Sequence, residues 1–431
     1  MEVFKKTIIS NDILRVLRVK PFFLMMVSEF FSQFAFNMQN FVLIFVIFGA
    51  THSSTAVSGI ILSFTIPAVL FSIFSGVYVD RWNKKKIIFY THLVRGILLL
   101  PFLIPNLPIA YIYILTFLIA VATQFFIPAE SAIIPQLIPK NLIIPGNAIF
   151  AFGIYSTILL GYMFSGPALI ILGKTYTILF LSSLFFISTF FVTAIKFPHN
   201  KKTAKAEKHS SSQNVSFIHE TKEVFSFIRR ARLVMHAILM LTIAQAVILT
   251  FAVLGPGYVT TILSSPLESL SWILIAPAGL GMAIGILFLG SIGKRFKQER
   301  LSALGFLAVG VSFILLPFGS KFASREFVST INYYLPSILH ITVLHIIVVL
   351  AFIIGFSISL VFIPANSIIQ LETGSRMRGR IYGFLNSMVG GVSFLPVILS
   401  GSLADILGVG SVISGIGILM LILSIVFFFL K

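Results

Sequence analysis

Long apolar runs dominate this chain, and short polar segments separate one run from the next. Hydrophobic residues make up 58% of the sequence and charged residues only 10%, which excludes a soluble globular protein. A backbone in lipid must satisfy its hydrogen bonds internally, and the runs are much longer than the roughly 10 residues of a membrane-spanning β-strand. They therefore predict transmembrane α-helices and exclude a β-barrel.

Clusters of Gly, Pro and charged residues divide the apolar sequence into predicted spans. The first run is too long for the apolar core of a cleavable signal peptide, so we expect it to stay in the membrane. The predicted fold is an all-α integral membrane protein with twelve transmembrane helices. These lie near residues 21–49, 55–79, 86–105, 108–127, 145–173, 175–196, 233–263, 270–292, 301–320, 337–363, 381–405 and 410–430.

The distribution of Lys and Arg predicts how these helices are oriented. If the N-terminus is cytoplasmic, the cytoplasmic segments hold 27 of the 31 Lys and Arg residues, in agreement with the positive-inside rule. We therefore expect both termini in the cytoplasm. The net charge of +18 is spread over separate loops and tails that lack stacking aromatic residues, which argues against nucleic-acid binding.

The two halves of the chain share two landmarks. The loop GVYVDRWNKKK at 76–86 returns in altered form as GSIGKRFK at 290–297, and IPAESAIIPQL at 127–137 returns as IPANSIIQL at 363–371. Parallel repeats of six helices predict two pseudo-symmetric bundles related by an axis along the membrane normal. We expect a cytoplasmic tail, an N-terminal bundle, a cytoplasmic linker with an amphipathic helix, and a C-terminal bundle, at residues 1–20, 21–196, 197–231 and 232–431.

The first loop resembles the signature loop of the major facilitator superfamily, in which a Gly, three residues, an Asp and a basic residue precede a second Gly and more basic residues. Asn83 stands at the second Gly, and Lys294 replaces the Asp in the second copy. The resemblance implies a secondary transporter that alternates access around a central site between two bundles. It also implies a conformational latch formed by Gly76, Asp80, Arg81 and Lys85.

Asp80 supplies the carboxylate of this latch. At the end of its span it is placed to face the positive N-terminal end of a helix in the other bundle, a contact that closes one side of the transporter and breaks in the other state. The alternative is that the charges of this loop, above all Lys84 to Lys86, only enforce topology.

Features beyond the signature loop resemble the macrolide-efflux-like branch of drug exporters. These are the two Pro-Ala segments, Gln370 with the Arg-Gly-Arg at 378–380, and an Asn that opens the span after each Pro-Ala segment, Asn147 and Asn386. In the fifth span, residues 161–168 resemble the Gly-Pro motif of exporting members, with Gly166 and Pro167 at its centre. The resemblance implies export of small molecules.

The first span carries a polar stripe within an apolar segment, on a face that must look into protein or water. A carboxylate in hydrocarbon costs several kcal/mol, so Glu29 is a candidate for proton coupling or for pairing with a cation. Arg95 on the third span lies at a similar depth, so a structural ion pair and a coupling role are both open. The stripe consists of Glu29, Gln33, Asn37 and Asn40, at i, i+4, i+8 and i+11.

The rest of the predicted central cavity is mostly apolar, which favours lipophilic substrates. Gln124 on the fourth span and Gln245 on the seventh are its remaining polar candidates, and the resembled branch commonly has an acid where this chain has Asn37. The histidines, His92 among them, have spacings that favour packing over metal binding. The chain has no cysteine, so disulfides and thiolate sites are excluded, and we expect no metal and no cofactor.

The function that these features favour is proton-coupled efflux of amphipathic or lipophilic small molecules by a monomer, with protons and membrane lipids as the other partners. Two alternatives stay open: a lipid or lysolipid flippase on the same fold, and a non-transporting membrane receptor or scaffold that uses the linker. We expect no enzyme, because no nucleophile–base pair, metal cluster or phosphate loop is present. The 46 Phe residues, with frequent Ile and Lys, are typical of an AT-rich bacterial genome, and we expect the protein in a bacterial inner membrane.

Overall fold

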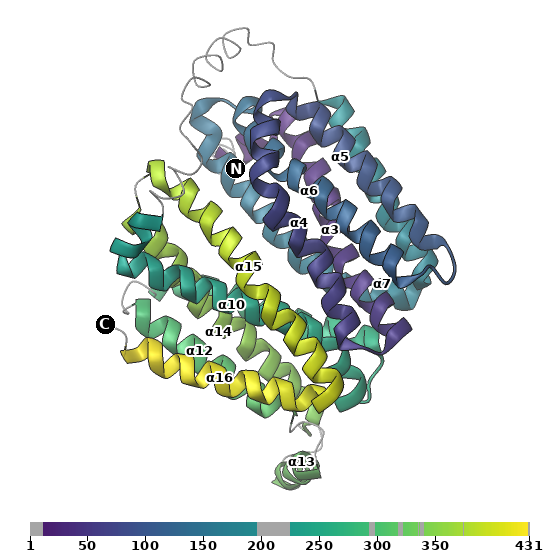
Figure 1. Cartoon of the computed structure of the whole chain (residues 1–431), viewed down its shortest axis with the longest axis vertical. Coiled ribbons are helices and arrows are strands. Elements are labelled where there is room, and N and C mark those ends of the chain that lie inside the picture. The colour runs from purple at the N-terminus through teal and green to yellow at the C-terminus, as the bar shows by residue number, and fades with distance from the viewer. Residues whose placement is uncertain are drawn as a thin grey trace, which may run out of the picture. The chain divides into compact units, whose positions relative to one another are not determined.

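A computed structural model describes residues 12–195, 225–292, 298–317, 322–334, 336, 340–373 and 375–429, and every regular element in these ranges is helical (Figure 1). The first half contains α2 (Asp12–Leu17), α3 (Lys20–Thr51), α4 (Ser54–Arg81), α5 (Lys84–Leu99), α6 (Ile109–Leu137) and α7 (Ile143–Ala194). The second half contains α10 (Arg232–Gly257), α11 (Ala276–Ile292), α12 (Gln298–Leu315), α13 (Phe322–Tyr334), α14 (Val343–Glu372), α15 (Ser375–Leu407) and α16 (Val409–Phe429). Between these helices lie five single turns: η1 (Leu100–Leu103), η2 (Lys140–Leu142), η3 (Tyr258–Ile262), η4 (Leu267–Ser269) and η5 (Ser271–Ile275).

Every predicted span overlaps a described helix, but two of the spans share one helix, so the count of twelve transmembrane helices stays a prediction. Ten helices of the described chain are long and apolar enough to cross a membrane, and Arg300–Leu315 is a shorter apolar helix. The helix α7 covers two predicted spans. Its 52 residues are interrupted at Gly173, whose φ is 70°. Glycine adopts this left-handed conformation easily because it has no Cβ. The prediction of an all-α membrane fold is confirmed.

The described helices group into two units. Unit 1 comprises residues 1–41, 63–161 and 171–222, and unit 2 comprises residues 42–62, 162–170 and 223–431. The end of α3 and the beginning of α4 therefore belong to unit 2, together with a short stretch of α7. The predicted domain boundaries stay a prediction.

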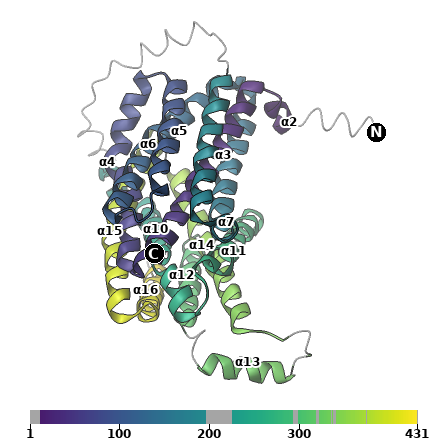
Figure 2. The same ribbon diagram turned by 90° about the vertical axis from the view of Figure 1, so that its right-hand side faces the viewer.

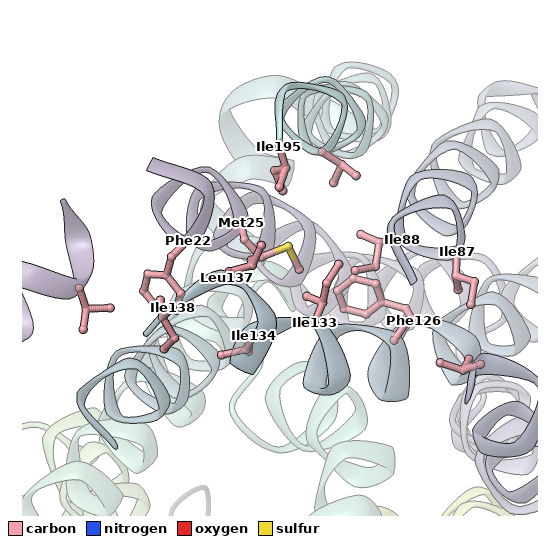
Figure 3. Close-up of a cluster of buried hydrophobic side chains, with 14 of the residues drawn as sticks. Phe22, Met25, Ile87, Ile88, Phe126, Ile133, Ile134, Leu137, Ile138 and Ile195 are labelled. Atoms are coloured by element: carbon pink, nitrogen blue, oxygen red, sulfur yellow. The ribbon is translucent and has the colours of Figure 1, made fainter. Parts of the chain in front are cut away.

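The core of unit 1 lies where α3, α5 and α6 meet. Met25, Ile88, Phe126 and Ile133 are almost completely buried, and Figure 3 shows their side chains pointing toward one another. Each comes from the apolar face of its own helix, since residues spaced by three or four positions share a face. This packing fixes the helix faces on which the polar residues of unit 1 lie.

In unit 2, α11 and α12 pack on α14, α12 on α16, and α10 on α14 and α15. Close approach of α11 to α14 depends on glycine, because a Cβ at Gly281 or Gly355 would overlap backbone atoms of the facing helix. Figure 2 shows α13 lying across the long helices of this unit, beyond their ends. The Asn332 amide ties α13 to the chain before α14, because it donates to the Ile341 carbonyl and accepts from the Ile341 N–H, both at 2.8 Å.

The beginning of α4 is capped by a carboxylate from the far end of the sequence. Asp405, near the end of α15, accepts hydrogen bonds from the Ser54 N–H (2.8 Å), the Thr55 N–H (3.0 Å) and the hydroxyls of Ser53 and Thr55 (both 2.7 Å). Below this cap the Ser58 hydroxyl donates to the Val397 carbonyl at 2.8 Å. A carboxylate stabilises a helix N-terminus because it satisfies free N–H groups and opposes the positive end of the helix dipole.

We expect Asp405→Asn to weaken this cap, because the amide is uncharged and has one acceptor oxygen instead of two. The expected loss is about 1 kcal/mol of unfolding free energy, as for other helix N-caps. Thermal unfolding in detergent measures it, and Glu372→Gln at the exposed end of α14 is the matched control. An equal response of the two variants would show that the cap contributes nothing.

Candidate functional site

Four titratable side chains are buried together inside unit 1. Glu29 and Glu130 are each 2% exposed, and His92 and Arg95 are fully buried. Glu29 and Glu130 interact electrostatically with each other and with Arg95. We call Glu29, His92, Arg95 and Glu130 the buried charge cluster.

Three helices supply the cluster, and helical periodicity explains its composition. Glu29 comes from the polar stripe of α3, and His92 and Arg95 share one face of α5 because they are three residues apart. Glu130 follows Phe126 by four residues on α6, so the same face of α6 presents an aromatic ring and a carboxylate. The cluster therefore borders directly on the apolar core that contains Phe126.

The guanidinium of Arg95 is held by its own helix and by two aromatic rings. Its Nε donates to the Thr91 carbonyl at 3.3 Å, and its Nη2 donates to His92 Nδ1 at 2.9 Å. Its Cζ lies 4.6 Å from the centre of the Phe126 ring and 5.0 Å from that of Phe185, which are cation–π distances. The remaining nitrogen, Nη1, has no hydrogen-bond partner among the described residues.

Three of the four carboxylate oxygens of the cluster lack a well-formed hydrogen bond. These are both oxygens of Glu29 and one oxygen of Glu130, which are buried in the described chain, and the two carboxyl groups lie close enough to interact with each other. Buried polar groups are nearly always paired, and an unpaired buried charge is costly. Three such carboxylate oxygens beside one unpaired guanidinium nitrogen make this cluster the candidate functional site.

A chain of hydrogen bonds continues from Arg95 through His92. Because Arg95 donates to Nδ1, this nitrogen is an acceptor, and the neutral ring carries its proton on Nε2. Nε2 lies 3.4 Å from the Ser28 hydroxyl, which itself donates to the Ser188 carbonyl of α7 at 3.0 Å. The Ser32 hydroxyl also reaches Nδ1, at 3.2 Å. The imidazole is thus fixed in one tautomer by α3, α5 and α7.

Two of the predicted cavity residues, Glu29 and Arg95, belong to this cluster. A third, Gln33, is among the electrostatic neighbours of Glu29. Asn37 bonds within its own helix, since its amide donates to the Gln33 carbonyl at 2.8 Å. A Cβ added to Gly161 of α7 would lie only 2.8 Å from the Cβ of Asn37. The glycine therefore allows α7 to approach α3 closely.

Two further cavity candidates lie outside the cluster. Gln124 is buried, and its amide is 3.5 Å from the Ala120 carbonyl of the same helix. Gln245 is half-buried on α10, which belongs to unit 2. A role in substrate binding stays a prediction for both.

The predicted latch is described only in part. The side chains of Asp80 and Arg81, like Gly76, lie outside the described part of the structure, although the α4 backbone is described as far as Arg81. Lys85 caps the end of α7, because its Nζ donates to the Thr193 carbonyl at 2.9 Å and to the Ile195 carbonyl at 2.6 Å. This cap gives Lys85 a structural contact that the sequence did not reveal.

The Gly-Pro segment of α7 packs closely against η4 and η5. The Gly166 N–H donates to the Ser271 hydroxyl at 3.0 Å, and a Cβ at Gly166 would overlap the Glu268 carbonyl. Pro167 lies inside the helix, where it lacks an N–H to donate. This contact requires a glycine at 166, because any side chain would push the backbone of η4 away.

Sequence reasoning missed two members of the cluster. Glu130 stands in the IPAESAII segment, which served only as a repeat landmark, and a carboxylate within an apolar stretch was the available signal. His92 was interpreted as an isolated packing residue, although its spacing of three from Arg95 places both on one face.

Comparison with known proteins identifies the family. Residues 25–395 match the sequence profile of the Major Facilitator Superfamily. The chain belongs to this superfamily. Among its relatives in Bacillus subtilis, the uncharacterized MFS-type transporter YfiS is 23% identical, over 85% of this chain and 82% of YfiS. The uncharacterized MFS-type transporter YvqJ is 24% identical, over 91% of this chain and 87% of YvqJ.

Solved structures of superfamily transporters share the fold. The nucleoside transporter NupG superposes with a TM-score of 0.71 at 12% identity, covering 95% of this chain and 100% of NupG. A POT family transporter in complex with 5-aminolevulinic acid superposes with a TM-score of 0.67 at 13% identity, covering 94% of this chain and 95% of that protein. The chain is therefore an integral membrane protein with the fold of a major facilitator transporter.

Proposed function

We propose that this superfamily member is a proton-coupled exporter of amphipathic or lipophilic small molecules that works by alternating access. The observation that carries the proposal is the pair of buried carboxylates, Glu29 and Glu130, three of whose four oxygens lack a hydrogen bond beside a single arginine. A bacterial inner membrane with both termini in the cytoplasm is the setting that we propose for it.

The charges of the cluster balance only when it binds a proton. With Arg95 cationic, His92 neutral and both carboxyls ionised, the cluster has one net negative charge, and a single proton makes it neutral. Burial strongly disfavours the charged form, whereas contact with water favours it. A change in water access during transport would therefore change how many protons the cluster holds, which is what coupling requires.

Alternating access also needs contacts that form in one state and break in the other. The Asp405 cap on α4 joins segments about 350 residues apart, and three of its four hydrogen bonds are exposed to solvent, so we propose that it releases when this end of the transporter opens. The Asp80 latch remains our proposal for the opposite end.

The proposed export and substrate class rest on different features. Export is supported by the resemblance to the macrolide-efflux-like branch and by the tight glycine contacts of α7. A lipophilic substrate is supported by the apolar spans. Arg95 is fully buried between two rings, so it does not present its charge to a lipid headgroup in this structure, which disfavours the flippase alternative.

The test is transport by purified protein in proteoliposomes under an imposed pH gradient, with ethidium and erythromycin as probes and a luminal dye to follow protons. We expect Glu29→Gln and Glu130→Gln each to lower gradient-driven accumulation at least about tenfold while probe exchange without a gradient continues, because neutral amides bind substrate but carry no proton. Glu326→Gln, on the exposed face of α13, is the matched control.

If the double variant of Glu29 and Glu130 still accumulates probe in response to the pH gradient, the cluster does not couple protons. Transport that depends on lipid headgroups and moves no protons would instead support a flippase.

A further inference from the structure

We infer that His92 is a positioning residue that holds the Arg95 guanidinium back from the two carboxylates, so that they remain free to take up a proton. This inference rests on the proton coupling proposed above. It concerns a residue that touches neither the substrate nor, in this structure, either carboxylate.

The donors of Arg95 show how the guanidinium is held. Thr91 engages Nε and His92 engages Nη2, while Phe126 and Phe185 fix the guanidinium from its sides. Within the described chain, Nε and Nη2 bond to Thr91 and His92, and Nη1 has no hydrogen-bond partner, so no hydrogen bond joins Arg95 to either carboxylate. The arginine therefore acts on the carboxylates through space and not through direct contact.

A directly paired arginine would prevent proton uptake. A bidentate guanidinium–carboxylate ion pair is strong, and it occupies the oxygens to which a proton would bind. By giving Nη2 another acceptor, His92 competes with the carboxylates for this donor. Without that acceptor, Nη2 becomes a second unpaired buried donor, and the unpaired oxygens of Glu29 and Glu130 are the acceptors left to satisfy it.

His92 performs this role only in its neutral tautomer. The hydrogen bond from the Ser28 hydroxyl to the Ser188 carbonyl orients Ser28 to accept from Nε2–H, which leaves Nδ1 free to accept from Arg95. A protonated ring would point Nδ1–H at the guanidinium, so two donors would face each other. Among the described residues, Arg95 on α5 is the charged group that acts on the ring, while Glu29 on α3 and Glu130 on α6 act on Arg95. The helix α7 contributes the Ser188 carbonyl.

Three substitutions separate the acceptor from the bulk of the ring. His92→Asn keeps an oxygen near the position of Nδ1, His92→Gln moves the amide to the position of Nε2, and His92→Phe keeps only the ring. We expect the Phe and Gln variants to shift the pH of half-maximal gradient-driven transport about one pH unit lower, a tenfold change in proton affinity, because the freed guanidinium pairs with a carboxylate. We expect the Asn variant to follow the wild type.

A second measurement needs no substrate. Infrared titration of the carboxyl C=O band in reconstituted protein, assigned with Glu29→Gln and Glu130→Gln, should show the same downward shift in the Phe and Gln variants. Thr116→Val is the control for buried packing, since Thr116 lies on α6 and bonds only to the Ile112 carbonyl of its own helix. If the Phe variant does not fold, the Gln variant still tests the inference.

Two results would overturn the inference. One is a Gln or Phe variant that titrates like the wild type, and the other is an Asn variant that shifts as far as the Phe variant, which would reduce His92 to a packing residue. Failure of the proposed function looks different, because the variants of Glu29 and Glu130 would then keep gradient-driven transport. The infrared titration would still test His92 in that case.

Discussion

Replacement of Arg95 by Met is expected to destabilise the protein by about 3–5 kcal/mol, the usual cost of removing one partner from a buried ionic cluster. Arg95 is fully buried and is the cation that opposes Glu29 and Glu130. Without it, both carboxyls must be neutral in the folded protein. The variant also loses the guanidinium stacked between Phe126 and Phe185.

The loss should depend on pH with a defined sign. Because the folded variant must hold protons that the unfolded chain releases at neutral pH, its stability should fall as the pH rises and recover in acid. Thermal unfolding in detergent at about pH 5 and about pH 8 measures this dependence. Lys174→Met removes an exposed cation and should cost less than about 0.5 kcal/mol at either pH. An Arg95→Met variant that melts like the control would show that the cluster is not an ionic unit.

Replacement of Gly355 by Ala is expected to be the most damaging single-methyl change in unit 2, with a loss of about 3 kcal/mol or more. A Cβ on Gly355 would overlap the carbonyl oxygen of Ala278 on α11. The obstacle is backbone and not the end of a flexible side chain, so the helices α11 and α14 must separate. Gly281 meets the Phe352 carbonyl at the same crossing, which leaves little room for adjustment.

The matched control for this prediction is Gly391→Ala on α15, where a Cβ would meet nothing within 4 Å. Replacing a helical glycine by alanine in open space stabilises by up to about 1 kcal/mol. Thermal unfolding and the yield of folded protein measure both variants. Equal behaviour of the two variants would contradict the close helix crossing.

The fold was predictable because the signals for it are local. An apolar run of the right length predicts a span from its own residues, and the repeated loops show that the halves are related. Within α7 the backbone is non-helical at Gly173, close to the predicted boundary between two spans. The family followed from the same loop, and the sequence profile confirms it. The macrolide-efflux-like branch stays a prediction.

The candidate site was predictable only in part. Glu29 and Arg95 could be singled out, because each is a charge within an apolar span and helix rise placed them at similar depth. Glu130 could not be joined to them, because nothing in its own segment shows that its face of α6 turns toward α3. His92 could not be placed between Arg95 and Ser28 for the same reason.

The sequence by itself determined which segments enter the membrane, that the chain is built from two related halves, and that a few charges must be buried. Tertiary structure alone decided that Glu29 meets Glu130, that His92 meets Ser28, and that Asp405 caps α4. The physical reason is that helix periodicity depends on neighbours in sequence, whereas the pairing of helix faces depends on the packing of side chains far apart in the chain.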